Sequence, residues 1–382
     1  MQVTLVTPAP QLVCASLLPG FVAGRHLLAD CAIPLEPLVR RSGVRWRAAR
    51  AVELDAQAQA VLLDDNSVLR FDWLSLCNEP LQDRDVLEHA MPGARKNGLF
   101  VRPHDAFCAL WPRVPELAAS QPLRVAVIGG EVGEGINGMD GINGVDGVKD
   151  GKGRVGCGDA FAIELALAIR HRLPGAAVTL ITGGAPLAAG LTPAMQKRIV
   201  QAMRQRNVTV LADTATCIHR SSILLGCGAS LACDVPLIAT GAQKPAWLAN
   251  SGLALDGQGF IAVDASLRST SHANVFAPGQ PVVGSDAGVS DAALFHAGQA
   301  LVGSLDATLT AGTAGLLART NADAPQRLVA RTAGPPVHPL RMLSCGDGHA
   351  IASWHGYGAQ GRWLGWLKNR MDQRLIAGYR DI

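Results

Sequence analysis

The chain has 382 residues, of which 48% are hydrophobic and 17% charged, so it is long enough for two or three domains with a sizeable core. Its formal net charge is only +3 at pH 7, which argues against the strong basic field of a nucleic-acid-binding protein. No apolar run is long enough to cross a bilayer, and prolines interrupt the apolar first residues, which lack a leading basic segment. We therefore expect a cytoplasmic protein without a signal peptide.

Nine cysteines are scattered along the chain, and no two have the C-x-x-C or C-x4-C spacing of a redox dithiol. An odd, dispersed set predicts reduced thiols and not a disulfide framework. Histidines such as His104 show no metal-ligand spacing, and we expect them to be surface residues or hydrogen-bonded core residues. The sequence therefore predicts no metal site, and it identifies no catalytic residue.

The beginning of the chain predicts short strands. Residues 2–6 form an apolar run before a proline-rich turn. Residues 44–74 alternate between polar and apolar side chains in the manner of antiparallel strands, and Asp64, Asp65 and Asn66 supply the turn between the last two.

The middle of the chain predicts alternating strands and helices. Residues 123–128, 178–182 and 207–212 are nearly continuous apolar runs, which are typical of buried parallel strands. Residues 159–173 and 194–206, which lie between these runs, have helical patterns. This β-α-β-α-β order indicates a doubly wound parallel domain.

A tract rich in Gly, Asn and Asp, residues 135–153, nearly repeats the hexapeptide GINGMD within that domain. Such a tract cannot bury apolar surface, so we interpret it as an inserted surface loop. A calcium-binding loop is the alternative, because Asp140, Asp146 and Asp150 are regularly placed oxygen donors, although their spacing fits no standard calcium motif.

A glycine turn, Gly129-Gly130, directly follows the first strand of this domain. A strand, a glycine turn and a helix N-terminus together bind a dinucleotide diphosphate, because glycines admit it and the helix dipole favours its charge. Glu131 and Glu134 occupy the second and third glycine positions of G-x-G-x-x-G, whereas GKGRVG at 151–156 fits the pattern but follows no strand. This region is either a nucleotide-binding site or a glycine-rich loop that binds no ligand, and the sequence leaves both interpretations open. The next strand is followed by neither an acidic nor a basic residue, so the sequence does not choose between NAD and NADP.

Several segments resemble the pyridine-nucleotide/FAD-dependent oxidoreductases, a family that includes disulfide reductases, type II NADH dehydrogenases and sulfide:quinone reductases. The segments are SLLPGFVAG (16–24), RVAVIGG (124–130) with IELALAIRHRL (163–173), ATGAQKPAWLANSGLALDGQGFIAVDASLRSTSHANVFAPG (239–279) and GRWLGWLKNRMDQRL (361–375). The chain most resembles the branch encoded beside or fused to selenide, water dikinase, and the likeness covers nearly its whole length.

The resemblance implies an α/β fold with two Rossmann-like dinucleotide-binding domains, one for FAD and one for NAD(P)H. The FAD domain would be discontinuous, formed by residues 1–120 and 246–310. The NAD(P)H domain would be inserted between them at 121–245, with a low-complexity insertion at about 131–158. Residues 311–382 would form a linker and a small C-terminal segment.

The resemblance also implies which residues bind the cofactors. Pro19 and Gly20 would lie near the flavin, and Glu164 near the contact between nicotinamide and flavin. Thr240 and Gly241 would lie at the domain crossing. The other cofactor-binding residues would be Gly129 and Gly130 in the nucleotide turn, and Gly279 and Gln280 beside the FAD diphosphate and ribityl chain.

The chain departs from the family at several of these contacts. The family's opening strand, G-x-G-x-x-G turn and helix, which hold FAD, have no counterpart in this sequence. Gln280 replaces an aspartate, Cys77-Asn78-Glu79-Pro80 replaces a glycine-containing turn, and the Gly/Asn/Asp tract interrupts the second glycine loop. A shortened gene start or a decayed gene would produce this pattern.

The C-terminal segment is basic and aromatic. Residues 362–380 contain five Lys or Arg residues and one Asp, with Trp363 and Trp366 among them. Such a helix would either dock on the FAD domain or rest at a membrane surface and reach a quinone pool.

Two functional hypotheses follow. In the first, an FAD-dependent oxidoreductase passes hydride from NAD(P)H through flavin to a small acceptor, either a quinone or a selenium or sulfur compound, with a functional link to selenide, water dikinase. The lack of a redox dithiol favours direct transfer from flavin to the acceptor. In the second, the chain is a degenerate remnant or binding module that no longer holds FAD. The oligomeric state is not predicted.

Overall fold

The computed structural model of the protein describes residues 2–77, 82–130, 157–189, 191–241, 245–256, 259–264, 266–278 and 340–380. The chain divides into two units. Unit 1 comprises Met1–Pro8, Val44–Glu79 and Lys244–Val337, and unit 2 comprises Ala9–Gly43, Pro80–Gln243 and His338–Ile382. These units are defined by contacts, whereas the FAD and NAD(P)H domains are assigned by function, so the domain bounds stay a prediction.

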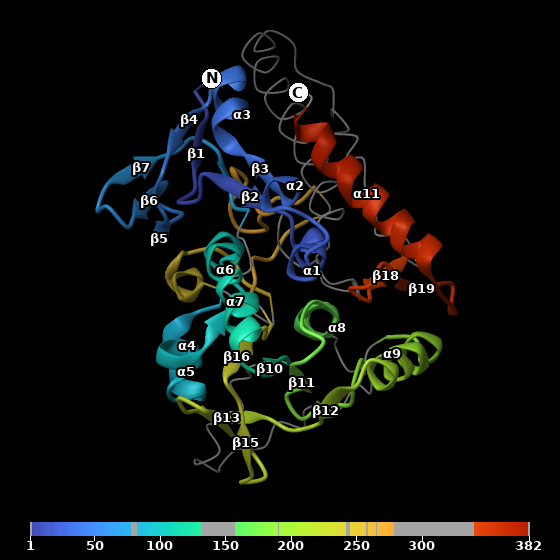
Figure 1. Cartoon of the computed structure of the whole chain (residues 1–382). Coiled ribbons are helices and arrows are strands. Elements are labelled where there is room, and N and C mark those ends of the chain that lie inside the picture. Colours follow the sequence, from blue (N-terminus) through green and yellow to red (C-terminus); the bar gives the residue numbers. More distant parts are fainter. Residues whose placement is uncertain are drawn as a thin grey trace, which may run out of the picture. The chain divides into compact units, whose positions relative to one another are not determined.

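A five-stranded parallel sheet lies at the centre of unit 2 (Figure 1). Its strands, in spatial order, are β12 (Val208–Leu211), β11 (Ala177–Ile181), β10 (Arg124–Ile128), β16 (Val235–Ile238) and β9 (Leu99–Phe100). The three predicted apolar runs form β10, β11 and β12. The chain proceeds from β10 to β11 and β12 on one side, while β16 lies on the other side of β10. This change of direction beside β10 is the topological switch point, where α/β sheets bind ligands.

Helices α8 (Cys157–Arg172) and α9 (Pro193–Gln205) connect β10, β11 and β12. One face of α8 carries Phe161, Leu165, Ala168 and Ile169, the opposite face carries Ala162, Ile163, Ala166 and Leu167, and both faces are buried. The reason is that α8 packs against the sheet, against α1 (Leu18–Val22) and against β18 (Arg341–Ser344). Residues 131–156, most of the predicted insertion, lie outside the described residues.

The rest of unit 2 consists of short elements. The helices are η1 (Ala15–Leu17), α2 (Leu28–Cys31), α3 (Leu35–Ser42), α4 (Arg84–Ala90), α5 (Ala94–Asn97), α6 (His104–Leu110) and α7 (Arg113–Ser120). The strands are the antiparallel pair β2 (Gln11–Val13) and β3 (Ala32–Pro34), and the meander β13 (Ala215–Ile218), β14 (Ser222–Leu225) and β15 (Ser230–Ala232).

The C-terminal segment belongs to unit 2. Strands β18, β19 (Ala350–Trp354) and β20 (Tyr357–Gly361) form an antiparallel sheet that leads into α11 (Arg362–Arg380). The inner face of α11 buries Leu364, Lys368 and Ile376, and Nζ of Lys368 donates hydrogen bonds to the Ser16 carbonyl and to Asp372, both at 2.9 Å. The helix therefore docks on the N-terminal part of unit 2.

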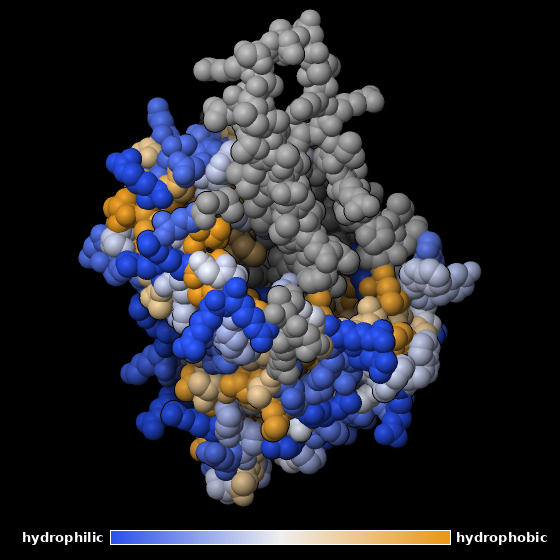
Figure 2. Space-filling model, turned by 90° about the horizontal axis from the view of Figure 1, so that it is seen from above, coloured by the Kyte–Doolittle hydropathy of each residue, from blue (hydrophilic) through white to orange (hydrophobic). Residues whose placement is uncertain are grey.

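The outer face of α11 is aromatic. Trp363 and Trp366 are 63% and 62% exposed, and the Arg370 guanidinium lies 5.5 Å from the Trp366 ring centroid. Elsewhere, on the face shown in Figure 2, hydrophobic residues lie in small groups among hydrophilic ones, as on most soluble surfaces. Within the described residues, no helix has the length and apolar character needed to cross a bilayer.

Unit 1 contains two parallel strand pairs and a meander. The pairs are β1 (Thr4–Val6) with β4 (Arg45–Arg47), and β8 (Leu74–Ser75) with β17 (Val275–Phe276); a short helix, η2 (Ala246–Asn250), follows the chain's return to this unit. The meander is β5 (Ala51–Asp55), β6 (Ala60–Leu63) and β7 (Val68–Arg70). The antiparallel prediction is confirmed for β5, β6 and β7 but is wrong for β4 and β8, which pair in parallel with β1 and β17.

Candidate functional site

At the carboxyl edge of the unit 2 sheet, backbone hydrogen bonds connect the ends of three neighbouring strands, β11, β10 and β16. The Gly129 amide donates to the Ile181 carbonyl (2.8 Å), and the Ala239 amide donates to the Ile128 carbonyl (2.8 Å). The Gly241 amide donates to the Gly130 carbonyl (2.9 Å). The turns after β10 and β16 therefore lie side by side at the switch point, and each contains a predicted nucleotide-binding pair.

A glycine of the turn after β10 touches a glycine of the turn after β11. Gly130 and Gly183 both have positive φ, +85° and +70°, and a Cβ added to Gly130 would lie 2.8 Å from Cα of Gly183. Only glycine fits such an approach without displacing backbone. The neighbouring turn therefore occupies the side of Gly130 where a side chain would lie. The cofactor-binding role of Gly129, Gly130, Thr240 and Gly241 stays a prediction.

A buried glutamine joins the ends of β9 and β16. Gln82 Nε2 donates to the carbonyl of Ile238 (3.0 Å) and to the carbonyl of Thr240 (3.3 Å), while Gln82 Oε1 accepts from the Arg102 amide (3.0 Å). Gln82 and Thr240 are 6% and 2% exposed. The Gln82 amide thus links the turn that contains Thr240 and Gly241, through Nε2, to the backbone after β9, through Oε1.

Arg102 and His104 lie beside this glutamine, and both are buried. The Arg102 guanidinium lies 5.7 Å from the Phe161 ring centroid and donates to the Thr240 carbonyl at 3.4 Å. His104 packs against the same ring, and its Nδ1 lies 2.9 Å from the Val101 carbonyl. Burial, reinforced by the Arg102 charge, lowers the pKa of His104 to about 4, so its imidazole is neutral at physiological pH.

Sequence reasoning did not find Gln82 or Arg102, and it left His104 as a surface or core histidine. The structure makes His104 a core residue. Gln82 and Thr240 are 158 positions apart, and no local motif links them. No sequence signal could have found Gln82 or Arg102, because their burial is a property of the fold. Six of the ten buried polar or charged residues in the described part of the chain lie in unit 2, either just after β9, β11 or β16, in the segment before α4, at the start of α6 or on α8. They are Gln82, Arg102, His104, Glu164, Thr182 and Thr240.

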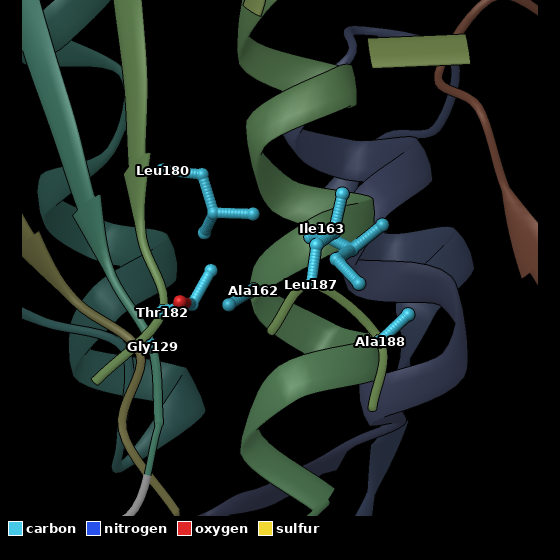
Figure 3. Close-up of a pocket in the computed structure, with 7 residues that line it drawn as sticks. All are labelled: Gly129, Ala162, Ile163, Leu180, Thr182, Leu187 and Ala188. Atoms are coloured by element: carbon cyan, nitrogen blue, oxygen red, sulfur yellow. The ribbon is translucent and has the colours of Figure 1, made fainter. Parts of the chain in front are cut away.

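The crevice between β11 and α8 is nearly filled. A cavity of about 10 Å³ remains, enclosed by Gly129, Ala162, Ile163, Leu180, Thr182, Leu187 and Ala188 (Figure 3). That volume holds about one water molecule, whereas ligand pockets are usually several hundred Å³. The Thr182 hydroxyl donates to the Ala185 carbonyl. This crevice between β11 and α8 is therefore too small for a ribose, and the NAD or NADP preference stays open.

Glu164 lies on α8 and faces the C-terminal segment. Its Oε1 accepts a hydrogen bond of 2.5 Å from the Ser344 amide, and the carboxylate is 8% exposed. Beside it, Gly346 lies so close to α8 that a Cβ would be 2.8 Å from Cα of Ala168. Within unit 2, Glu164 therefore fixes β18 onto α8; its predicted place near the nicotinamide stays a prediction.

Pro19 and Gly20 lie in α1, which packs on α8. A Cβ on Gly20 would overlap the imidazole ring of His26, so this ring covers the open face of Gly20. Burial, together with the neighbouring Arg25 charge, lowers the pKa of His26. The role of Pro19 and Gly20 beside the flavin stays a prediction.

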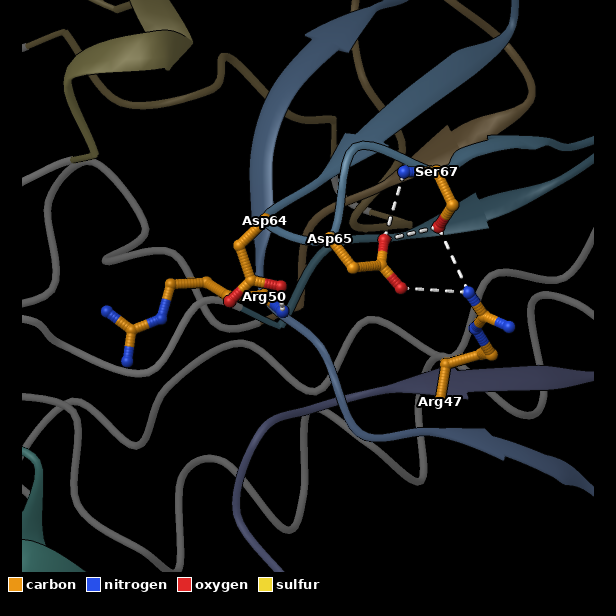
Figure 4. A network of polar contacts seen from close by, with 5 residues as sticks. All are labelled: Arg47, Arg50, Asp64, Asp65 and Ser67. Atoms are coloured by element: carbon orange, nitrogen blue, oxygen red, sulfur yellow. Dashed lines mark hydrogen bonds and ion pairs between the residues drawn. The ribbon is translucent and has the colours of Figure 1, made fainter.

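The described part of unit 1 does not form a diphosphate cradle. No glycine lies within two residues after the carboxyl ends of its four parallel strands. At the end of β4, Arg47 instead binds Asp65 and Ser67, both at 3.0 Å, and the Arg50 amide donates to Asp64 (Figure 4). These residues therefore do not fit FAD by themselves. Gly279 and Gln280, the predicted FAD contacts, lie outside the described residues.

The described residues contain no group of three or more His, Cys, Asp or Glu side chains placed to hold a metal ion. The three aspartates of the alternative calcium loop lie outside the described residues.

Residues 120–285, less than half of the chain, match the family model of the pyridine nucleotide-disulphide oxidoreductases. No curated protein sequence matches the chain. Several solved structures are similar. The sulfide:quinone oxidoreductase from the hyperthermophilic bacterium Aquifex aeolicus is 15% identical, with a TM-score of 0.69 over 100% of this chain and 86% of that chain. NDH2 from Plasmodium falciparum, solved in complex with NADH, is 12% identical, with a TM-score of 0.66 over 98% of this chain and 92% of that chain.

A third similar structure, an NAD-dependent persulfide reductase from A. fulgidus, is 14% identical, with a TM-score of 0.61 over 92% of this chain and 59% of that chain. At such identities the likeness establishes the fold. The protein has the α/β, Rossmann-like fold of FAD- and NAD-binding oxidoreductases, which confirms the predicted fold class.

Proposed function

We propose that this chain is an FAD-dependent oxidoreductase of the pyridine nucleotide-disulphide oxidoreductase family, which passes hydride from NAD(P)H to a small acceptor. The observation that carries the proposal is the glycine-lined switch point of unit 2, where the turns after β10 and β16 are hydrogen-bonded together. It lies within residues 120–285, which match a family whose members use FAD and NAD(P)H.

The residues of unit 2 bind and orient the nucleotide in this proposal. Gly129 and Gly130 admit the diphosphate, and Thr240 and Gly241 border it from β16. NAD(P)H supplies a hydride, and FAD is the group that accepts it when bound. The buried, neutral His104 and the Phe161 ring keep water from the inner side of this edge.

Direct transfer to the acceptor, without a protein thiol, is supported by the lack of a C-x-x-C or C-x4-C pair and by the burial of Cys108, Cys233 and Cys345. Burial raises the pKa of Cys108 and Cys345 to about 12 and that of Cys233 to about 11, so these thiols are poor nucleophiles. The acceptor classes that we propose are a quinone and a selenium or sulfur compound. The link to selenide, water dikinase rests on the sequence resemblance alone.

A peripheral membrane contact is part of the same proposal, and the exposed aromatic face of α11 supports it. Trp363 and Trp366 are presented to solvent beside Arg370, as in helices that bind anionic lipid surfaces. Such a contact would bring a cytoplasmic enzyme to a quinone dissolved in the bilayer.

The second candidate is a remnant or binding module that holds no FAD. The strand ends in unit 1 favour it, because their described residues lack glycine turns.

One titration separates the two candidates. Purified protein is mixed with FAD and then with NADH or NADPH, and flavin bleaching is followed without oxygen; a short-chain quinone or a polysulfide is then added. The proposed enzyme bleaches on NAD(P)H addition and regains colour with the acceptor. A folded protein that takes up no FAD, with NAD(P)H left unoxidised, leaves only the remnant.

A further inference from the structure

The side-chain amide of Gln82 bridges the ends of strands β9 and β16. Strand β9 pairs with β16 through Phe100, and the Val101 amide still donates to the Ile238 carbonyl at 3.1 Å. Pro103, two residues later, has no amide N–H and therefore cannot donate another hydrogen bond between the strands. At the end of this pairing, the Gln82 side-chain amide connects the two strands. Its Oε1 accepts from the Arg102 amide, and its Nε2 donates to the Ile238 carbonyl, which Val101 also uses, and to the Thr240 carbonyl.

Gln82 bonds to the segment at the end of β16, which leads to Thr240 and Gly241 at the proposed dinucleotide site. In an extended chain, successive residues point their backbone groups to opposite sides. Ala239 and Gly241 donate toward β10, to Ile128 and Gly130. The carbonyls of Ile238 and Thr240 face the other way, and Gln82 binds both. Gln82 and β10 thus hold the turn from its two edges.

We infer that Gln82 is a positioning residue for dinucleotide binding, which keeps the turn containing Thr240 and Gly241 in register with Gly130. This inference deepens the proposed function and rests on it. Gln82 does not touch the ligand; it acts through the carbonyls of Ile238 and Thr240. Without the Gln82 hydrogen bonds, one edge of the turn is no longer held. The dinucleotide must then order the turn as it binds, and this entropic cost lowers its affinity.

The experiment compares Gln82→Leu with Gln201→Leu, the same chemical change at an exposed position on α9. ADP-ribose binding is measured by calorimetry well below each variant's melting temperature, and KM and kcat are measured with NADH in the flavin-loaded protein. Gln82→Leu is expected to weaken ADP-ribose binding tenfold or more and to raise KM similarly, with kcat within about twofold. Gln201→Leu is expected to match the wild type.

Gln82→Met provides the second variant, because its unbranched side chain fits the same space without hydrogen bonds. Gln82 variants that are folded and bind ADP-ribose as the wild type does would overturn the inference. A kcat that falls while KM and ADP-ribose affinity hold would also overturn it. If the folded wild type binds neither ADP-ribose nor NADH, the proposed function fails first, and this result is distinct from failure of the inference alone.

Discussion

Gly130 and Gly183 meet across the carboxyl ends of β10 and β11, where a Cβ on Gly130 would lie 2.8 Å from Cα of Gly183. Both residues have positive φ. Glycine is therefore required at this contact for two reasons: the backbone has positive φ, and there is no space for a Cβ. It also determines how closely the turns after β10 and β11 approach each other.

Gly130→Ala is expected to lower the free energy of unfolding by about 3 kcal/mol or more, because it adds a steric clash to the cost of positive φ. It should also weaken NADH binding. Two glycines serve as controls, since nothing lies within 4 Å of a Cβ added at either. Gly228→Ala, at φ +84°, should cost about 1 kcal/mol, and Gly175→Ala close to nothing. Equal losses at Gly130 and Gly228 in denaturant titrations would refute the close-contact explanation.

His104 should make the protein less stable in acid. Its pKa is about 4 in the folded protein and 6.5 in an unperturbed histidine, so between these pH values the unfolded chain binds more protons. Stability is therefore present above pH 6.5 and is lost as the pH falls toward 4, by about 3 kcal/mol. His104→Gln should flatten this part of the pH profile, measured by denaturant titration. His26 titrates in the same direction and is unchanged in the variant. An identical slope in both proteins would contradict the account.

Glu164 should stabilise the C-terminal segment through the Ser344 amide. Glu164→Leu leaves a buried N–H without an acceptor and is expected to cost about 1–3 kcal/mol. Glu164→Gln keeps an acceptor oxygen and should cost about 1 kcal/mol, because it loses only the charge-assisted part of the bond. Hydrogen exchange at the Ser344 amide should be fastest in the leucine variant. Equal exchange in all three proteins would show that the bond does not hold β18.

The α11 surface is tested with lipid vesicles. Co-sedimentation with anionic vesicles should fall several-fold in the double variant Trp363→Ala, Trp366→Ala, because each indole that enters the lipid boundary contributes to binding. Trp354→Ala, at an equally exposed tryptophan on β19, is the control and should bind normally. Unchanged sedimentation of the double variant would exclude this face as the lipid contact.

The sequence could predict those parts of the fold that local patterns encode. Apolar runs identify β10, β11 and β12, and glycines after apolar strands identify Gly130 and Gly241. Strand β9 has only two residues, too few for a pattern, and its place in the sheet depends on pairing with β16. For the same reason Gln82 could not be predicted: its partners Ile238 and Thr240 are 156 and 158 positions away.

The parallel pairing of β4 with β1 was also beyond local reasoning. Alternation of polar and apolar residues predicts a half-buried strand but not its direction. Strands β1 and β4 are also separated in the chain by Ala9–Gly43, a segment of unit 2.

The proposed binding of a nicotinamide dinucleotide at the switch point of unit 2 is tested most directly by calorimetric titration of the wild-type protein with NADH and NADPH. We predict saturable binding of at least one of them, with one site per chain, that ADP-ribose displaces and Gly130→Ala weakens. A folded protein that gives no binding heat with either nucleotide, and that shows no shift in melting temperature with ADP-ribose, would contradict the proposal.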